Sequence, residues 1–108
     1  MIKLNFNVNN TELKRIDTFP VISKSKRMHQ AVFDFDGEIW RGVEKIAIFT
    51  DSWGKSRRMY LGKYKKCKCI IPAKALTGTY FNIVVYGGDL ITTNEISVPL
   101  VYSSYKKF

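Results

Sequence analysis

Residues 79–86 read TYFNIVVY, and the apolar side chains Phe81, Ile83 and Val85 recur there at every second position around the polar Asn82. A period of two is that of an extended strand with one face in a core. Gly87 and Gly88 follow at once and permit the backbone angles of a tight turn. This stretch therefore predicts a half-buried strand that turns back at residues 87–89.

The same pattern extends in both directions along the chain. Strands are expected at residues 2–8, 12–16, 19–23, 31–35, 44–50, 57–61, 66–71, 79–86 and 91–102. The run 44–50 is almost continuously apolar, which is typical of a strand buried on both faces. Pro72 and Gly78 bracket one helical turn at residues 72–76, and Pro99 predicts an edge position in the last strand. Short strands with frequent turns predict an all-β fold, an antiparallel β-sandwich of about seven to eight strands, with a small barrel as the alternative.

Length and composition fit one domain. The chain has 108 residues, of which 45% are hydrophobic, and this predicts a single sandwich over residues 1–105 with a short basic tail at 106–108. No apolar run is long enough for a transmembrane helix, and the alternating start predicts no signal peptide and no membrane insertion. We expect one common core, made up of the apolar residues Phe33, Phe35, Trp40, Phe81, Ile83, Val85, Ile96 and Val98.

The sequence has few residues that could bind a metal or take part in catalysis. Cys67 and Cys69 form one C-x-C, which cannot complete a tetrahedral zinc shell, so free thiols, no metal and no cofactor are expected. His29 is the one histidine, and we interpret it as a polar strand residue. Asp34, Asp36 and Glu38 could cluster carboxylates for calcium or acid–base chemistry, but a solvated strand end is the favoured interpretation. No catalytic residues are assigned, and the protein is predicted not to be an enzyme.

A basic segment stands out instead. The net charge is +9, and no acid occurs between Ser52 and Gly88, which favours polyanionic or acidic partners. Alternation predicts that its charges line the outside of one sheet, opposite Met59, Leu61 and both cysteines. The candidate interaction surface consists of Lys55, Arg57, Arg58, Tyr60, Lys63, Tyr64, Lys65, Lys66 and Lys68.

Aromatic residues within this segment keep a second function open. Trp53, Tyr60 and Tyr64 lie among the positive charges, an arrangement that binders of single-stranded nucleic acid use to stack bases. The alternative is thus a small basic β-barrel of the OB type. We expect at least one of the three rings to be buried, which would leave no continuous stacking platform, and nucleic acid is the less favoured partner. A hydrolase, based on the carboxylate cluster, ranks third.

Several blocks carry a resemblance to a known family. Residues 40–49 (WRGVEKIAIF) resemble W-x-G-x-x-K-x-A-x-F, and residues 69–76 (CIIPAKAL) resemble C-x-(V/I)-P-x-x-x-L. YFNIVVYGGD at 80–89, LITTN at 90–94 and an ending with Val98 and Tyr105 follow in order. Over residues 28–105 the chain resembles phage and prophage tail or baseplate proteins. It is similar to the immunoglobulin-like N-terminal domain of phage baseplate upper proteins. The first 27 residues match loosely, and the basic segment 55–68 and Cys67 depart from the pattern.

The resemblance implies a structural or adaptor module of the virion, without cofactor or catalysis. Its implied partners are other tail or baseplate proteins, and it supplies no binding residues. We expect the partner to meet the basic segment with an acidic surface, and a homo-oligomer remains open. The expected location is the virion, after synthesis in the bacterial cytoplasm.

Overall fold

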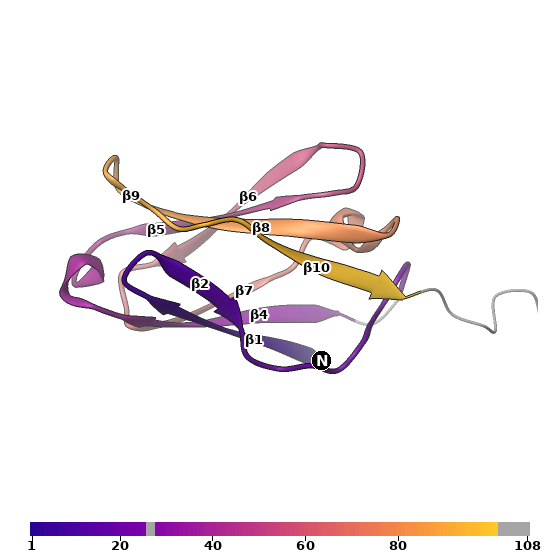
Figure 1. Ribbon diagram of the computed structural model, residues 1–108, viewed down its shortest axis with the longest axis horizontal. Helices are drawn as coiled ribbons and strands as arrows, with labels where there is room; N and C mark the ends of the chain where they lie inside the picture. Colours follow the sequence, from indigo (N-terminus) through magenta and orange to yellow (C-terminus); the bar gives the residue numbers. More distant parts are fainter. Residues whose placement is uncertain (26–27, 102–108) are drawn as a thin grey trace, which may run out of the picture.

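The computed structural model describes residues 1–25 and 28–101, and these contain almost nothing but strands and turns (Figure 1). The predicted ends of the last strand at Tyr102 and of the domain at Tyr105, and the tail at 106–108, lie outside the described residues. The elements are β1 (Ile2–Asn9), β2 (Glu12–Arg15), β3 (Val21–Ile22), β4 (His29–Asp36), η1 (Glu38–Trp40), β5 (Lys45–Thr50), β6 (Ser56–Gly62), β7 (Lys66–Ile70), η2 (Ala73–Leu76), β8 (Tyr80–Gly87), β9 (Ile91–Thr92) and β10 (Ile96–Val101).

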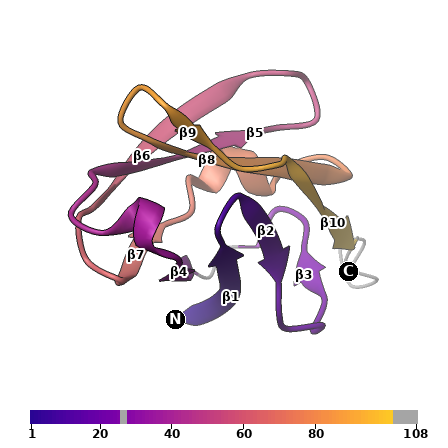
Figure 2. The same cartoon turned by 60° about the vertical axis from the view of Figure 1, so that its left-hand side comes forward.

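The strands form two sheets that pack face to face (Figure 2). The smaller sheet has the order β2-β1-β4-β7, and the larger has the order β3-β10-β8-β5-β6, with β9 paired to β8. The predicted sandwich is confirmed, and each predicted strand has a counterpart. The strand predicted at 19–23 is only the two-residue β3, and the strand predicted at 91–102 is divided into the two-residue β9 and β10, so the described residues hold more strands than the expected seven to eight. No helix among these residues is long and apolar enough to span a membrane.

Strand direction differs from the prediction at two places. β1 pairs in parallel with β4, from Ile2 beside His29 to Asn9 beside Asp36, and β10 pairs in parallel with β3. The expected purely antiparallel arrangement is therefore wrong for these pairs. The reason is that β3 joins the larger sheet, so the chain crosses over before β4 returns beside β1, as a parallel pair requires.

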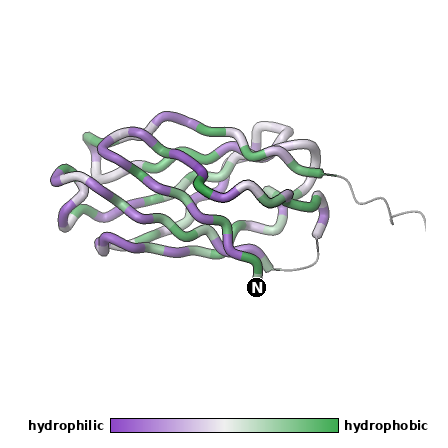
Figure 3. Tube along the Cα trace, turned by 60° about the horizontal axis from the view of Figure 1, so that its bottom comes forward, coloured by the Kyte–Doolittle hydropathy of each residue, from purple (hydrophilic) through white to green (hydrophobic). Residues whose placement is uncertain are grey.

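The core lies between the two sheets, and hydrophobic and hydrophilic residues alternate along the strands that enclose it (Figure 3). Seven of the eight predicted core residues belong to it, and the eighth, Ile96, is partly buried and packs against it. Trp40 is 2% exposed, packs against Phe35 and donates from Nε1 to the Asn10 carbonyl at 2.6 Å. Gly87 lies against the Trp40 ring, where a Cβ would come within 2.6 Å of Cζ3. Trp40 thus takes its predicted place in the core.

Polar groups also reach the core. His29 begins β4 on its buried side, with 2% exposure, so it is more deeply buried than a polar strand residue would be. Lys45 is completely buried on the core face of β5, and its Nζ donates to the carbonyls of Val43 (3.0 Å) and Tyr64 (3.2 Å). Desolvation lowers the pKa of Lys45. These bonds fasten the β6–β7 turn to β5.

The two cysteines face the core from β7, as the alternation predicts, and both are free thiols. The Cys67 thiol donates to the Tyr64 carbonyl at 2.9 Å, beside the Lys45 bond to the same oxygen. Burial raises the pKa of Cys67, and it raises the pKa of Cys69 to about 12. Both groups are therefore neutral and unreactive at neutral pH.

Candidate interaction surface

The basic segment runs along one side of the sandwich, because β6 and β7 are the end strands of the two sheets and follow one another in the chain. The predicted alternation is confirmed: Arg58 and Tyr60 face outward opposite Met59 and Leu61, and Lys66 and Lys68 face outward opposite the cysteines. The charges do not line one sheet, however. Those of β6 lie on the larger sheet and those of β7 on the smaller one, so this expectation is wrong.

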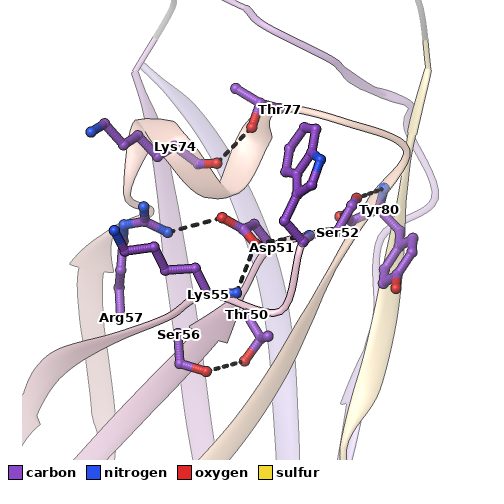
Figure 4. A network of polar contacts seen from close by, with 10 residues as sticks. Thr50, Asp51, Ser52, Lys55, Ser56, Arg57, Lys74, Thr77 and Tyr80 are labelled. Carbon is purple, nitrogen blue, oxygen red and sulfur yellow. Dashed lines mark hydrogen bonds and ion pairs between the residues drawn. The ribbon is translucent and has the colours of Figure 1, made fainter.

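Two of the predicted basic residues form ion pairs with acidic residues of the same chain. Asp51, in the β5–β6 turn, is buried and accepts hydrogen bonds from the backbone N–H groups of Trp53 (3.0 Å) and Lys55 (2.9 Å) and from Arg57 Nη1 (3.3 Å; Figure 4). The Lys55 N–H bond first, and Arg57 second, lower the pKa of Asp51. Arg57 therefore organises the turn.

The second of these paired residues is Lys65. Its Nζ lies 2.6 Å from Asp34 and 3.2 Å from Asp36, and the hydrogen bonds to these carboxylates raise the pKa of Lys65. The Asn7 side chain and Lys65 together lower the pKa of Asp36. The carboxylate cluster of the sequence is thus an ion-paired strand end, and within the described residues no group of three His, Cys, Asp or Glu is placed to hold a metal ion.

What remains is a strip of exposed cations, which we call the basic edge. It consists of Lys55, Arg58, Lys63, Lys66 and Lys68. Lys66 lies opposite Asp34 in the register between β7 and β4, whereas Lys68 lies opposite Val32. The basic edge follows the free sides of β6 and β7, whose outer N–H and C=O groups no neighbouring strand covers in the described chain. Positive charge along such an edge also deters uncontrolled strand pairing.

The aromatic residues correct a further expectation. Trp53 is 71% exposed, Tyr60 62% and Tyr64 80%, so the prediction that at least one ring is buried is wrong. Their spacing still prevents a shared platform, because Trp53 precedes β6 and Tyr64 follows it, and the strand between them spans about 20 Å. The Tyr60 hydroxyl also donates to Glu44, which places a carboxylate beside the ring.

A shallow cavity of ≈ 530 Å³ opens at the end of the sandwich between the β4–η1 loop and the β6–β7 turn. Phe35 and Trp40 are among its lining residues, as are Glu38 and Arg41, which form an exposed ion pair 3.6 Å apart. The Asp36–Lys65 pair also lines it. Its charged groups are mostly paired with one another, and no nucleophile with an adjacent base is among its lining residues.

The fold of the chain is similar to that of a solved phage protein domain. No protein family model matches the chain, and no curated protein sequence matches it. Among solved structures, the chain is similar to the N-terminal domain of phage TP901-1 ORF48. That similarity has a TM-score of 0.66 at 8% sequence identity and covers 95% of this chain and 100% of the other. At so low an identity the likeness establishes a shared fold, an all-β two-sheet sandwich.

Proposed function

We propose that this protein is a non-catalytic structural or adaptor module of a phage tail or baseplate, with an immunoglobulin-like fold, that docks onto other virion proteins. The observation that carries the proposal is the fold likeness to a phage protein's N-terminal domain over the whole of that domain. The sequence resemblance to baseplate upper proteins points the same way. In this proposal the protein acts in the virion.

The basic edge is the surface we assign to docking. Arg58, Lys66 and Lys68 project from the end strands β6 and β7, and Lys55 and Lys63 lie in the turns on either side of β6, while Arg57 and Lys65 pair with acids of the same chain. A surface of one sign accelerates encounter with an acidic partner and selects against basic ones. The free sides of β6 and β7 could in addition pair with a strand of that partner. The proposed partner is therefore an acidic protein surface of the virion.

Immunogold electron microscopy of particles from the phage or prophage that encodes the chain tests this role. We expect label at the tail end, and label absent from the particles would contradict the proposal.

The triple variant Lys55→Glu, Lys63→Glu, Lys68→Glu should lower incorporation of the protein into particles at least about tenfold, because it reverses the charge of the docking surface. The control reverses Lys14 on β2 and Lys24 after β3, which are exposed and do not belong to the basic edge, and it should incorporate normally.

Nucleic-acid binding is expected to be weak. Without a shared stacking platform, single-stranded oligonucleotides should bind only through phosphate contacts, with Kd of about 10⁻⁴ to 10⁻⁶ M at physiological salt. Fluorescence anisotropy with labelled oligonucleotides checks this. Submicromolar binding that Tyr60→Ala or Tyr64→Ala abolishes would instead make the barrel-like nucleic-acid binder the better function.

A further inference from the structure

The outer faces of the two sheets have opposite characters. The smaller sheet presents many charged side chains outward, namely Lys3, Glu12, Lys14, Asp34, Asp36, Lys66 and Lys68. The strands of the larger sheet present mostly apolar and uncharged ones, namely Ile22, Ile46, Ile48, Thr50, Ser56, Tyr60, Tyr80, Asn82, Val84, Tyr86, Thr92, Ser97, Pro99 and Val101, with Arg58 as the charged residue among the described strand positions. A face that solvent alone covers normally resembles the first, and the second resembles the inside of an interface.

The centre of this face is the most apolar part. Ile46 and Ile48 project outward from β5, the strand that the sequence predicts to be buried on both sides, yet in the single chain they are only partly covered. The register places Ile46 between Tyr60 and Tyr86. Tyrosines flanking aliphatic side chains are common at protein interfaces, because they bury a large ring while keeping a polar tip.

A row of residues that lie side by side on neighbouring strands indicates what covers the face. Arg58, Ile48 and Val84 are neighbours in the register of β6, β5 and β8. Ile83 pairs with Ile96, the first residue of β10. Glu95 directly precedes the strand, and continuing the register by one residue would place it beside Val84. Glu95 is exposed, and it precedes the core-facing Ile96, so alternation directs it outward. The row therefore carries a cation at one end, a carboxylate at the other and two aliphatic residues between them.

We propose that a second copy of this chain binds to this face, about a two-fold axis parallel to the strands and passing between β5 and β8. Such an axis reverses the row, so Arg58 of each copy lies opposite Glu95 of the other, and the aliphatic centres meet. Isologous interfaces of this kind need a surface that is complementary to itself. Among the ion pairs of the described residues, Arg58 and Glu95 take part in none, so both charges are available.

The charge distribution of the whole chain favours this occupant. With a net charge of +9, two copies repel one another wherever their basic surfaces meet. The proposed axis places β6 of one copy over the β10 side of the other. Arg58 then lies in the interface, while Lys55, Lys63, Lys66 and Lys68 of each copy stay on opposite sides of the dimer and free for docking. The face measures on the order of 500 Å² per copy from strand spacing and rise, which reaches the lower end of specific interfaces. We therefore expect a dimer of roughly micromolar affinity.

Sedimentation velocity over about 1 to 500 µM protein tests the pairing. We expect a monomer–dimer equilibrium that Val84→Glu weakens at least about tenfold, since it buries a carboxylate at the centre of the face. Val32→Glu is the matched control, because Val32 is an equally half-buried valine on the outer face of the smaller sheet. A wild-type protein that stays monomeric throughout, or equal weakening by both substitutions, would overturn the proposal. Circular dichroism melting of each variant confirms folding.

Charge reversal distinguishes a second copy from any other partner. Arg58→Glu and Glu95→Arg should each weaken the dimer at least about tenfold, because each creates two like-charge contacts across the two-fold axis. The double variant restores opposite charges and should dimerise within about threefold of the wild type. Failure of the double variant to recover would overturn the assigned axis.

Discussion

Phe81→Ala is expected to lower the free energy of unfolding by about 3–5 kcal/mol, the range for truncating a fully buried phenylalanine. Phe81 is 0% exposed and packs against Phe49, with 6.1 Å between ring centroids. It belongs to β8, which pairs with β5 on one side and β10 on the other. Guanidinium unfolding followed by circular dichroism measures the effect, which is a large part of the total stability of a small domain.

Tyr80→Ala is the matched control for Phe81→Ala. Tyr80 is the preceding residue on the same strand, faces outward and is 37% exposed. Removing its ring should cost about 1 kcal/mol or less, since surface substitutions rarely cost more. Equal losses for the two variants would mean that the inward and outward faces of β8 are assigned wrongly.

The second large effect is expected at alkaline pH. Burial raises the pKa of Cys69 to about 12 from the ordinary value of 9.0. Between these two pH values the thiol stays protonated in the folded state and ionises in the unfolded state. Stability is therefore fully present below pH 9 and falls as the pH rises, by up to about 1.4 kcal/mol per pH unit. Denaturant unfolding at a series of pH values from 8 upward measures this slope.

Cys69→Ala isolates this thiol from other alkaline titrations. The substitution has a pH-independent packing cost and removes the slope, so the wild type should lose stability relative to the variant above pH 9. Lys45 acts in the opposite direction: its pKa is lowered, so its contribution to stability rises with pH up to the ordinary lysine value of 10.5. Parallel pH profiles for wild type and Cys69→Ala would contradict the prediction.

The sequence predicts strands well because burial of one face imposes a period of two. Phe81, Ile83 and Val85 face the core as their spacing indicates, and so do Cys67 and Cys69. Strand direction is not encoded in that period. The parallel pairing of β1 with β4 depends on the short β3 joining the opposite sheet, and no local pattern in residues 16–28 distinguishes the two sheets.

The candidate surface was predictable only in part, for a related reason. Which basic residues point outward follows from alternation, but the division of β6 and β7 between two sheets does not. The exposure of Trp53 and Tyr64 follows from their position in turns at opposite ends of β6. Lys45 was missed altogether, although its position two residues before Ala47 and four before Phe49 places it on the inward face of β5. The even spacing of Lys45 from these two core residues could therefore have shown from the sequence that its side chain faces inward.

The parallel pairing of β1 with β4 bears on how the chain is made. During synthesis the first strand leaves the ribosome long before its central partner, and until then only the β2 hairpin can cover one of its sides. The side chains of Leu4, Phe6 and Val8 stay exposed to water until residues 29–36 and the opposite sheet have been made and pack against them. Pairings between such distant segments raise the contact order, and proteins rich in them fold over milliseconds to seconds. The β1–β2 hairpin therefore keeps apolar side chains exposed until β4 and the opposite sheet have formed, and transiently exposed apolar surface of this kind is prone to aggregation.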